Sequence, residues 1–109
     1  VWLLINKVYG LLGLGARAGK VVSGMDAVSD EIKRNKIKLL IIAKDTSEKT
    51  ANNIKYLAQR KKVPILRIGT IKDNSKAIGK ENRAIIGIKD KNISNGIKKL
   101  CGGEAFGEN

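Results

Sequence analysis

The chain has 109 residues, and its 22 Lys and Arg against 10 Asp and Glu leave a net charge of +12 at pH 7. A chain of this length forms one domain with its own core, and its single Cys, Cys101, excludes an internal disulfide and fits a reducing cytoplasm. The charge predicts a polyanionic partner, and nucleic acid is preferred over a membrane surface. The chain has no histidine, which argues against catalysis by the usual general base and against imidazole metal ligands.

The first part of the chain has helical spacing. Four small or apolar residues recur on one helical face: Val8, Leu11, Leu12 and Gly15. This spacing predicts a helix from Asn6 to about Ala16 that ends in the glycine-rich turn GARAGK, followed by a short strand at Val21-Val22. The preceding apolar run over residues 1–5 is too short to span a bilayer, so we expect no membrane anchor and no signal peptide.

The next helix and strand form the centre of the predicted fold. Ser23 is expected to be the N-cap of a helix that begins near Met25, because Asp26 three residues later completes a pattern like a capping box. Asn35 is expected to be the C-cap of this helix. The unbroken apolar run over residues 39–43 then predicts a strand that is covered on both faces.

The alternation of helices and strands continues after this strand. The capping signature DTSE at residues 45–48 is followed by apolar residues at helical spacing, Ala51, Ile54, Leu57 and Ala58. Together they predict a helix that extends to Lys62. The basic run Arg60-Lys61-Lys62 is explained by the helix dipole, which favours cations in the last turn. An apolar segment over residues 63–69 predicts the next strand, with Pro64 tolerated at its beginning.

Three further elements are predicted in the last third of the chain. Asp73 or Asn74 is expected to cap a short helix that Gly79 ends. A strand is predicted over residues 83–88. Asn92 is expected to cap a final helix.

Helices between successive strands predict an α/β fold, a three-layer α/β/α sandwich around a small mixed sheet of about four strands. We expect a single domain over residues 1–103 and a flexible tail over residues 104–109. The acidic residues are scattered, and Asp26, Asp30 and Glu31 lie among basic neighbours on one helix. We therefore expect no metal site, no cofactor and no catalytic residue.

The glycine-rich segment over residues 13–20 resembles a phosphate loop, but its spacing does not fit one. Val21 stands where Ser or Thr would bind magnesium, and the segment follows a helix in place of a strand. The alternative is a helix-terminating turn from which Arg17 and Lys20 contact phosphate groups. We expect these two side chains to flank the same side of the molecule as the residues after Gly79.

The succession of segments resembles the ribosomal protein L-seven-Ae and L-thirty-e family of RNA binders, in particular its small bacterial members. The resemblance covers roughly residues 6–100 and rests on GARAGKVVSG, a helix, IKLLIIAKD, a capped helix, VPILRIG and a short helix ending Ala77-Ile78-Gly79. It implies an α/β/α sandwich that binds kink-turn RNA, whose sharp bend exposes tandem sheared G·A pairs and a flipped-out base. It also implies that the helix starting at Gly24 enters the RNA groove and that the loop at residues 79–83 covers the protruding nucleotide.

The RNA-binding residues expected from this resemblance and from the charge are Arg17, Lys20, Gly24, Met25, Asp26, Gly79, Lys80, Asn82 and Arg83. A helix N-terminus offers unpaired amides and half a positive charge to phosphate. The chain departs from the family pattern after Gly24, because Asp26, Ala27 and Asp30 stand where the family has Asn, Glu and Lys.

Asp26 and Met25 each allow two interpretations. Asp26 either accepts a hydrogen bond from a guanine amine or only caps the first turn of the helix. Met25 either packs against a base or lies in the core.

The expected function is that of a non-catalytic, cytoplasmic RNA-binding protein of the translation apparatus, which binds rRNA or another kink-turn-like RNA as a monomer, with the ribosome as a partner. Aromatic residues are few, which argues against stacking on single-stranded RNA. One alternative is a recognition module for an RNA-modifying enzyme. Another is a protein-interaction adapter of the translation or transcription machinery, in which Asp26 and Asp30 meet a basic partner and kink-turn binding is weak or lost.

Overall fold

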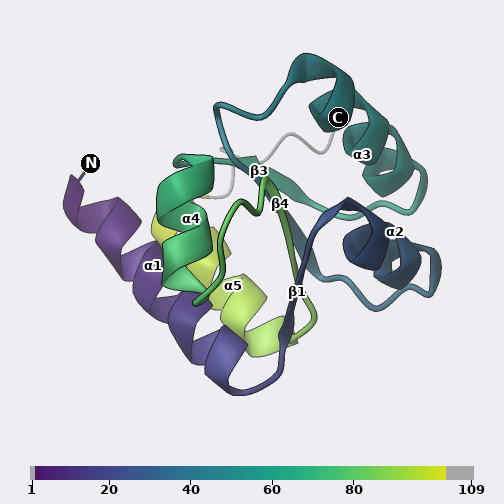
Figure 1. The fold of residues 1–109 in the computed structure, drawn as a ribbon. Coiled ribbons are helices and arrows are strands. Elements are labelled where there is room, and N and C mark those ends of the chain that lie inside the picture. The colour runs from purple at the N-terminus through teal and green to yellow at the C-terminus, as the bar shows by residue number, and fades with distance from the viewer. Residues whose placement is uncertain (1, 103–109) are drawn as a thin grey trace.

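The computed structural model describes residues 2–102, so the tail predicted at residues 104–109 lies outside the described residues. Helices and strands alternate along this part of the chain (Figure 1). They are α1 (Trp2–Arg17), β1 (Val21–Ser23), α2 (Met25–Lys33), β2 (Leu39–Ile42), α3 (Glu48–Arg60), β3 (Ile65–Arg67), α4 (Ile71–Ala77), β4 (Ile85–Ile88) and α5 (Lys91–Cys101).

The strands form one four-stranded sheet in the order β1-β4-β2-β3. β2 and β3 are parallel, whereas β4 is antiparallel to both of its neighbours, β1 and β2. All four residues of β2 are buried, as its unbroken apolar run predicts. The small mixed sheet expected from the sequence is therefore confirmed, and the structure adds the strand order.

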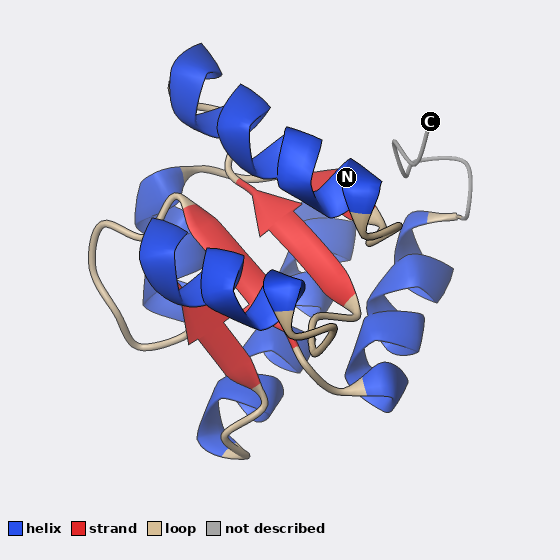
Figure 2. Cartoon of the chain, turned by 90° about the vertical axis from the view of Figure 1, so that its right-hand side faces the viewer, coloured by secondary structure: helices blue, strands red, loops and turns tan. Residues whose placement is uncertain are grey.

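Helices cover both faces of the sheet, which makes a three-layer α/β/α sandwich (Figure 2). Leu39 and Ile41 of β2 pack in one core cluster with residues of α1 and α5, while Leu40 and Ile42 pack in a second cluster with residues of α2 and α3. The alternation follows from the period of two along a strand, which points successive side chains to opposite faces. The predicted architecture is confirmed.

The helices α1 to α4 end in the same way, with one residue at positive φ directly after the cap. These residues are Gly19, Asn35, Lys62 and Gly79. After α2, for example, the amide of Asn35 donates to the carbonyl of Ile32 at 2.9 Å, and the amide of Lys36 donates to the carbonyl of Glu31 at 2.9 Å. This is the Schellman pattern, so the left-handed residue expected at Gly79 after α4 is confirmed. The C-cap expected at Asn35 is wrong by one residue, because Arg34 is the C-cap of α2 and Asn35 is the left-handed residue after it.

The expected N-cap of α2 is wrong. Ser23 is the last residue of β1, where it pairs with Ile86, and the cap is Gly24, which has no side chain to accept a hydrogen bond. The pairing of β1 with β4 holds Ser23 in extended conformation one residue before the helix begins. The capping pattern was therefore placed one residue too early.

The expected N-caps of the last two helices are also wrong by a few residues. In α4, the hydroxyl of Thr70 accepts a hydrogen bond from the amide of Asp73 at 3.1 Å, so the helix begins before Asp73 and Asn74. In α5, the carboxylate of Asp90 caps the helix two residues before Asn92. Each stretch contains several residues that can cap, and the tertiary position of the preceding strand selects one.

The remaining differences concern where elements begin and end. α1 begins at Trp2, four residues before the predicted start. β3 covers only residues 65–67, because the amide of Val63 still donates to the carbonyl of Ala58 at 2.8 Å and completes the end of α3. β4 begins at Ile85, two residues later than predicted, since Arg83 belongs to the preceding loop.

Candidate nucleic-acid interface

Four connections meet at one end of the sheet, which we call the Gly24 end: β1–α2, β2–α3, β3–α4 and α4–β4. Backbone hydrogen bonds join them in pairs. The amide of Gly24 donates to the carbonyl of Ile85 at 2.9 Å, and the amide of Ala43 donates to the carbonyl of Ala84 at 3.1 Å. The loops at this end therefore form one continuous surface.

The start of α2 is an open helix terminus. Gly24 has φ 95° and ψ 151°, a backbone conformation that is essentially restricted to glycine, and no side chain caps the first turn. A Cβ built on Gly24 would lie 3.3 Å from Nη1 of Arg83. The guanidinium of Arg83 thus lies directly beside the backbone where the helix begins.

The buried side chain of Ser75 holds Arg83 in this position. Its Oγ accepts a hydrogen bond from the amide of Arg83 at 2.7 Å and donates to the carbonyl of Arg83 at 3.3 Å. The carbonyl of Ser75 also accepts a hydrogen bond from the amide of Lys80 at 2.9 Å, which folds the α4–β4 loop onto α4. Among the described residues, the buried Nε of Arg83 has no hydrogen-bond acceptor.

A hollow of about 950 Å³ lies beside this loop, and three lysines are among the residues that line it. Lys72 and Lys76 come from α4, and Lys80 follows in the loop, together with Asn82. Ile71 adds an apolar, half-buried side chain. Lys72 and Lys76 were not predicted from the sequence, although their spacing of four residues would have placed them on one face of the predicted short helix.

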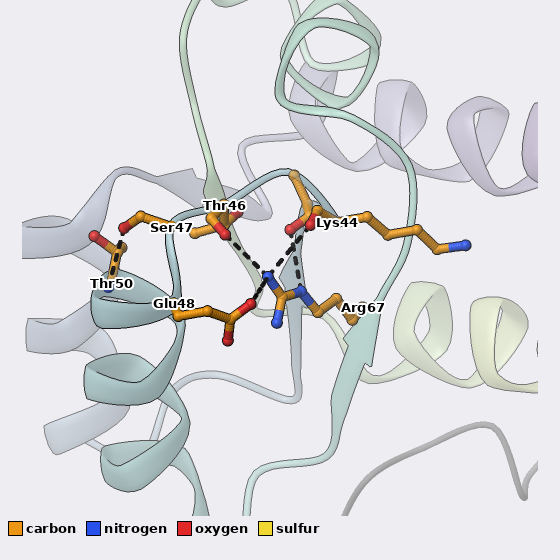
Figure 3. Close-up of polar contacts among 7 residues, drawn as sticks. Lys44, Thr46, Ser47, Glu48, Thr50 and Arg67 are labelled. Atoms are coloured by element: carbon orange, nitrogen blue, oxygen red, sulfur yellow. Dashed lines mark hydrogen bonds and ion pairs between the residues drawn. The ribbon is translucent and has the colours of Figure 1, made fainter.

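Arg67 holds the β2–α3 loop at the same end of the sheet (Figure 3). Its guanidinium donates to the carbonyls of Ala43, Lys44 and Thr46 at 3.4, 3.3 and 3.0 Å and forms an ion pair with Glu48 at 3.5 Å. The carboxylate of Asp45, in the same loop, accepts a hydrogen bond from the amide of Ile71 at 2.8 Å. Arg67 therefore orders the loop that ties α4 to the sheet.

Asn74 and Tyr9 fix α4 from its other side. Asn74 is buried, and its Nδ2 donates to the carbonyl of Ile68 at 2.9 Å, while the hydroxyl of Tyr9 donates to its Oδ1. Burial raises the pKa of Tyr9 above its ordinary value of 10.0, and the negative charge of Asp73 raises it further. Asn74 is thus a buried bridge between α1 and β3 and not the cap that its residue type indicates.

The structure places Arg83 against Gly24, which Met25 and Asp26 follow at the start of α2. Gly79, Lys80 and Asn82 line the hollow beside the α4–β4 loop, to which Arg83 also belongs. Asp26 is exposed in the first turn of α2. Met25 is half-buried and packs against the core cluster beneath α2 and α3, which favours the core interpretation of this residue.

The two basic residues expected to flank the loop after Gly79 lie in different places. The expectation that Lys20 flanks the same side is wrong, because β1 separates it from Gly24 and Lys20 lies at the opposite end of the sheet. Arg17 lies on α1, where a Cβ built on Gly13 would be 3.4 Å from Nη1 of Arg17 and 3.2 Å from the carbonyl of Ala77. It is thus close to the end of α4 and not to the start of α2.

Other kinds of site were sought in the same part of the chain. Within residues 2–102, no three Cys, Asp or Glu side chains lie close enough together to hold a metal ion. Over the same residues, every helix is too short or too polar to cross a membrane. Cys101 is half-buried against the core cluster under α1 and α5, and its burial raises the pKa of the thiol.

Comparison with known proteins gives relatives of similar length. RNA-binding protein YlxQ of Bacillus subtilis (strain 168) is 35% identical over 92 residues, which cover 84% of this chain and 92% of that protein. RNA-binding protein YlxQ of Enterococcus faecium is 31% identical over 98 residues, which cover 90% of this chain and 94% of that protein.

Solved structures share the fold. A protein of unknown function from Bacillus halodurans C superposes with a TM-score of 0.83 at 29% identity, over 86% of this chain and 95% of that one. The 15.5kD RNA binding protein of Giardia lamblia superposes with a TM-score of 0.78 over 92% of this chain and 86% of that one, and at 20% identity it shows the fold alone. Residues 6–101 match the family whose resemblance was inferred from the order of motifs. The chain therefore belongs to the ribosomal protein L7Ae/L30e/S12e/Gadd45 family.

Proposed function

We propose that this protein is a non-catalytic RNA-binding protein that recognises kink-turn RNA through the Gly24 end of its sheet. Family membership and the names of its two bacterial relatives support RNA binding as such. The net charge of +12 supports a polyanionic partner. In this proposal the protein acts as a monomer in the cytoplasm, and its target is ribosomal RNA or another RNA of the translation apparatus.

The observation that carries the proposal is the position of Arg83 beside Gly24. The half-buried side chain of Arg83 brings its Nη1 beside a helix terminus that has no side-chain cap. Arginine presents a planar fork of donors that matches phosphate, and the amides of a helix N-terminus favour the same charge. The two features together form a binding site for the RNA backbone at a point where the groove is distorted.

The hollow beside the α4–β4 loop supports recognition of a flipped-out nucleotide. Ile71 offers an apolar surface to a base, and Lys72, Lys76 and Lys80 line the same hollow and supply cations for the flanking phosphates. The carboxylates of Asp45 and Glu81 also line it, so the positive charge there is partly offset. Unstacked bases of this kind are the part of a structured RNA that proteins read most readily. The loop is held in place by Ser75, so the hollow is formed before RNA binds.

The test is a titration of the protein against a kink-turn RNA and a straight duplex of equal length. We expect at least tenfold tighter binding to the kink-turn RNA. Arg83→Ala removes charge-assisted hydrogen bonds that contribute about 1.5–3 kcal/mol, so it should weaken kink-turn binding by about 10- to 150-fold. Arg60→Ala is the matched control, because Arg60 is an exposed arginine on α3 whose guanidinium lies over the Tyr56 ring, and it should change affinity less than about threefold.

Either of two results would contradict the proposal. Equal affinity for both RNAs indicates binding by charge alone, and no binding to either RNA at modest salt favours the protein-interaction adapter.

A second variant tests the start of α2. Asp26→Asn restores an amide donor and removes a negative charge, so it should selectively strengthen kink-turn binding, whereas an unchanged preference would remove Asp26 from the site.

A further inference from the structure

Four lysines surround a second hollow at the end of the sheet opposite the Gly24 end. Its lining consists of Gly19, Lys20, Asn35, Lys36, Lys38 and Lys89, and we call it the lysine hollow. The sheet register places it there, because Val21 and Leu39 both align with Ile88 at this end, whereas Ser23 aligns with Ile86 toward the other. The lysine hollow is therefore separate from the candidate interface already described.

The backbone positions of these lysines are held by hydrogen bonds between different segments of the chain. The amide of Lys89 donates to the carbonyl of Lys20 at 2.8 Å, and the amide of Lys38 donates to the carbonyl of Ile88 at 2.7 Å. Lys36 is held by the Schellman pattern at the end of α2. Residues from three separate turns are thus brought together by the folded sheet and not by sequence spacing.

None of these four lysines forms an ion pair with a carboxylate within residues 2–102. None of the residues that line the lysine hollow is acidic, and the ion pair found within residues 2–102 is the one between Arg67 and Glu48 at the other end of the sheet. Like charges that gather without a counter-charge repel one another, and a bound anion removes this repulsion.

Helix dipoles explain two of the four lysines. Lys20 and Lys36 follow the carbonyl ends of α1 and α2, where a positive charge is favourable. Lys38 precedes a strand, and Lys89 lies next to the amino end of α5, where the dipole disfavours a cation. Local helix stability therefore does not account for the whole cluster.

We propose that the lysine hollow is a second phosphate-binding surface, which holds the backbone of a helical stem of the RNA whose bend is bound at the Gly24 end. This inference rests on the proposed function. Lys20 and Gly24 are four residues apart along an extended segment, about 13 Å at 3.3 Å per residue. This segment contains the edge strand β1, so a stem that runs from the bend along this edge of the sheet would reach both surfaces. Lysines are flexible point charges that follow phosphates without reading base sequence.

The experiment compares two RNAs, a kink-turn with short stems and the same kink-turn with each stem lengthened by a full helical turn. The test variant is Lys20→Gln, Lys36→Gln, Lys38→Gln and Lys89→Gln combined. The matched control removes the same charge from exposed lysines on other faces, Lys7→Gln, Lys49→Gln, Lys61→Gln and Lys99→Gln combined. Circular dichroism and thermal unfolding establish that both variants are folded, and affinity is measured at several salt concentrations.

For the long-stem RNA, we expect the test variant to bind about 10- to 100-fold more weakly near 0.1 M salt. The plot of log affinity against log salt should become less steep by about 2–3, because three or four phosphate contacts are lost. With the short-stem RNA it should bind within about threefold of the unchanged protein, and the control variant should do so with both RNAs, since its lysines make no phosphate contact.

Three results would overturn the inference. The first is a long-stem affinity of the test variant equal to that of the control variant. The second is an equal loss on both RNAs, which means a general effect of charge. The third is loss of binding to a polyglutamate peptide with unchanged RNA affinity, which assigns the hollow to an acidic protein. Failure of the proposed function is distinguishable, because it is measured as a lost preference of the unchanged protein for kink-turn RNA over duplex.

Discussion

Replacing Arg67 tests whether hydrogen bonds to the β2–α3 loop, and not the ion pair, stabilise the Gly24 end. Two of its contacts, to the carbonyls of Ala43 and Thr46, are partly buried, whereas those to Lys44 and Glu48 are exposed. At about 1 kcal/mol for each partly buried bond and close to zero for the exposed ones, Arg67→Met should lower the free energy of unfolding by about 2 kcal/mol.

This magnitude corresponds to a measurable change in melting temperature. With an unfolding entropy of about 2.1 cal/mol/K per residue, a 109-residue chain loses roughly 4 °C for each kcal/mol, so Arg67→Met should lower Tm by about 9 °C. Urea unfolding followed by circular dichroism gives the free energy directly. Hydrogen exchange of the Ile71 amide should also accelerate, because its acceptor, Asp45, lies in the loosened loop.

The matched control is Glu48→Gln, which removes the ion pair and keeps the carbonyl contacts. The Glu48 side chain is 76% exposed, so this change should cost less than about 0.5 kcal/mol. A loss in Glu48→Gln as large as that in Arg67→Met would refute the reasoning, since it would assign the stabilisation to the ion pair. A loss below about 0.5 kcal/mol in Arg67→Met would refute it as well.

Three further predictions concern stability. Gly24→Ala should lower the free energy of unfolding by about 1–3 kcal/mol, because alanine is strained at φ 95° and its Cβ would displace Arg83. Urea unfolding measures this loss, with Gly10→Ala as the control, since a Cβ on Gly10 meets no atom within 4 Å. Gly87→Ala should cost about 1–2 kcal/mol, since its Cβ would lie 2.8 Å from the buried Cδ1 of Ile37; no loss in a denaturant titration would contradict the close packing. The raised pKa of Tyr9 contributes stability that is present below pH 10 and lost as pH rises above it. The difference in unfolding free energy between the unchanged protein and Tyr9→Phe should therefore shrink between pH 8 and pH 11. A difference that stays constant over this range would contradict the prediction.

Local patterns were sufficient for the elements whose signal lies within a few consecutive residues. The apolar run from Leu39 to Ile42 predicted a strand buried on both faces, and the helical spacing from Ala51 to Ala58 predicted an amphipathic helix. Both predictions hold because burial of such a run dominates the free energy of that segment in any compact arrangement. The positions of the helix N-caps were harder to predict from the sequence. Neighbouring residues such as Thr70 and Asp73 can each cap a helix, and local chemistry does not distinguish between them.

The same limit applied to the candidate site. The structure sets Arg83 against Gly24, two residues that the family resemblance had grouped, whereas Lys20 lies at the other end of the sheet and Lys72 and Lys76 were not predicted. A strand as short as β1 carries the chain from one end of the sheet to the other, so residues close in sequence can lie at opposite ends.

The sequence by itself therefore determined the α/β class, the family, the central buried strand and the strong positive charge, because each of these depends on composition or on contacts within one segment. Only the tertiary structure decided which loops share an end of the sheet. It set Arg83 against Gly24, 59 residues away in the chain, and gathered Lys20, Lys36 and Lys89 at the other end. The physical reason is that strand order and register bring distant segments together through backbone hydrogen bonds, which carry no signature in the local pattern of side chains.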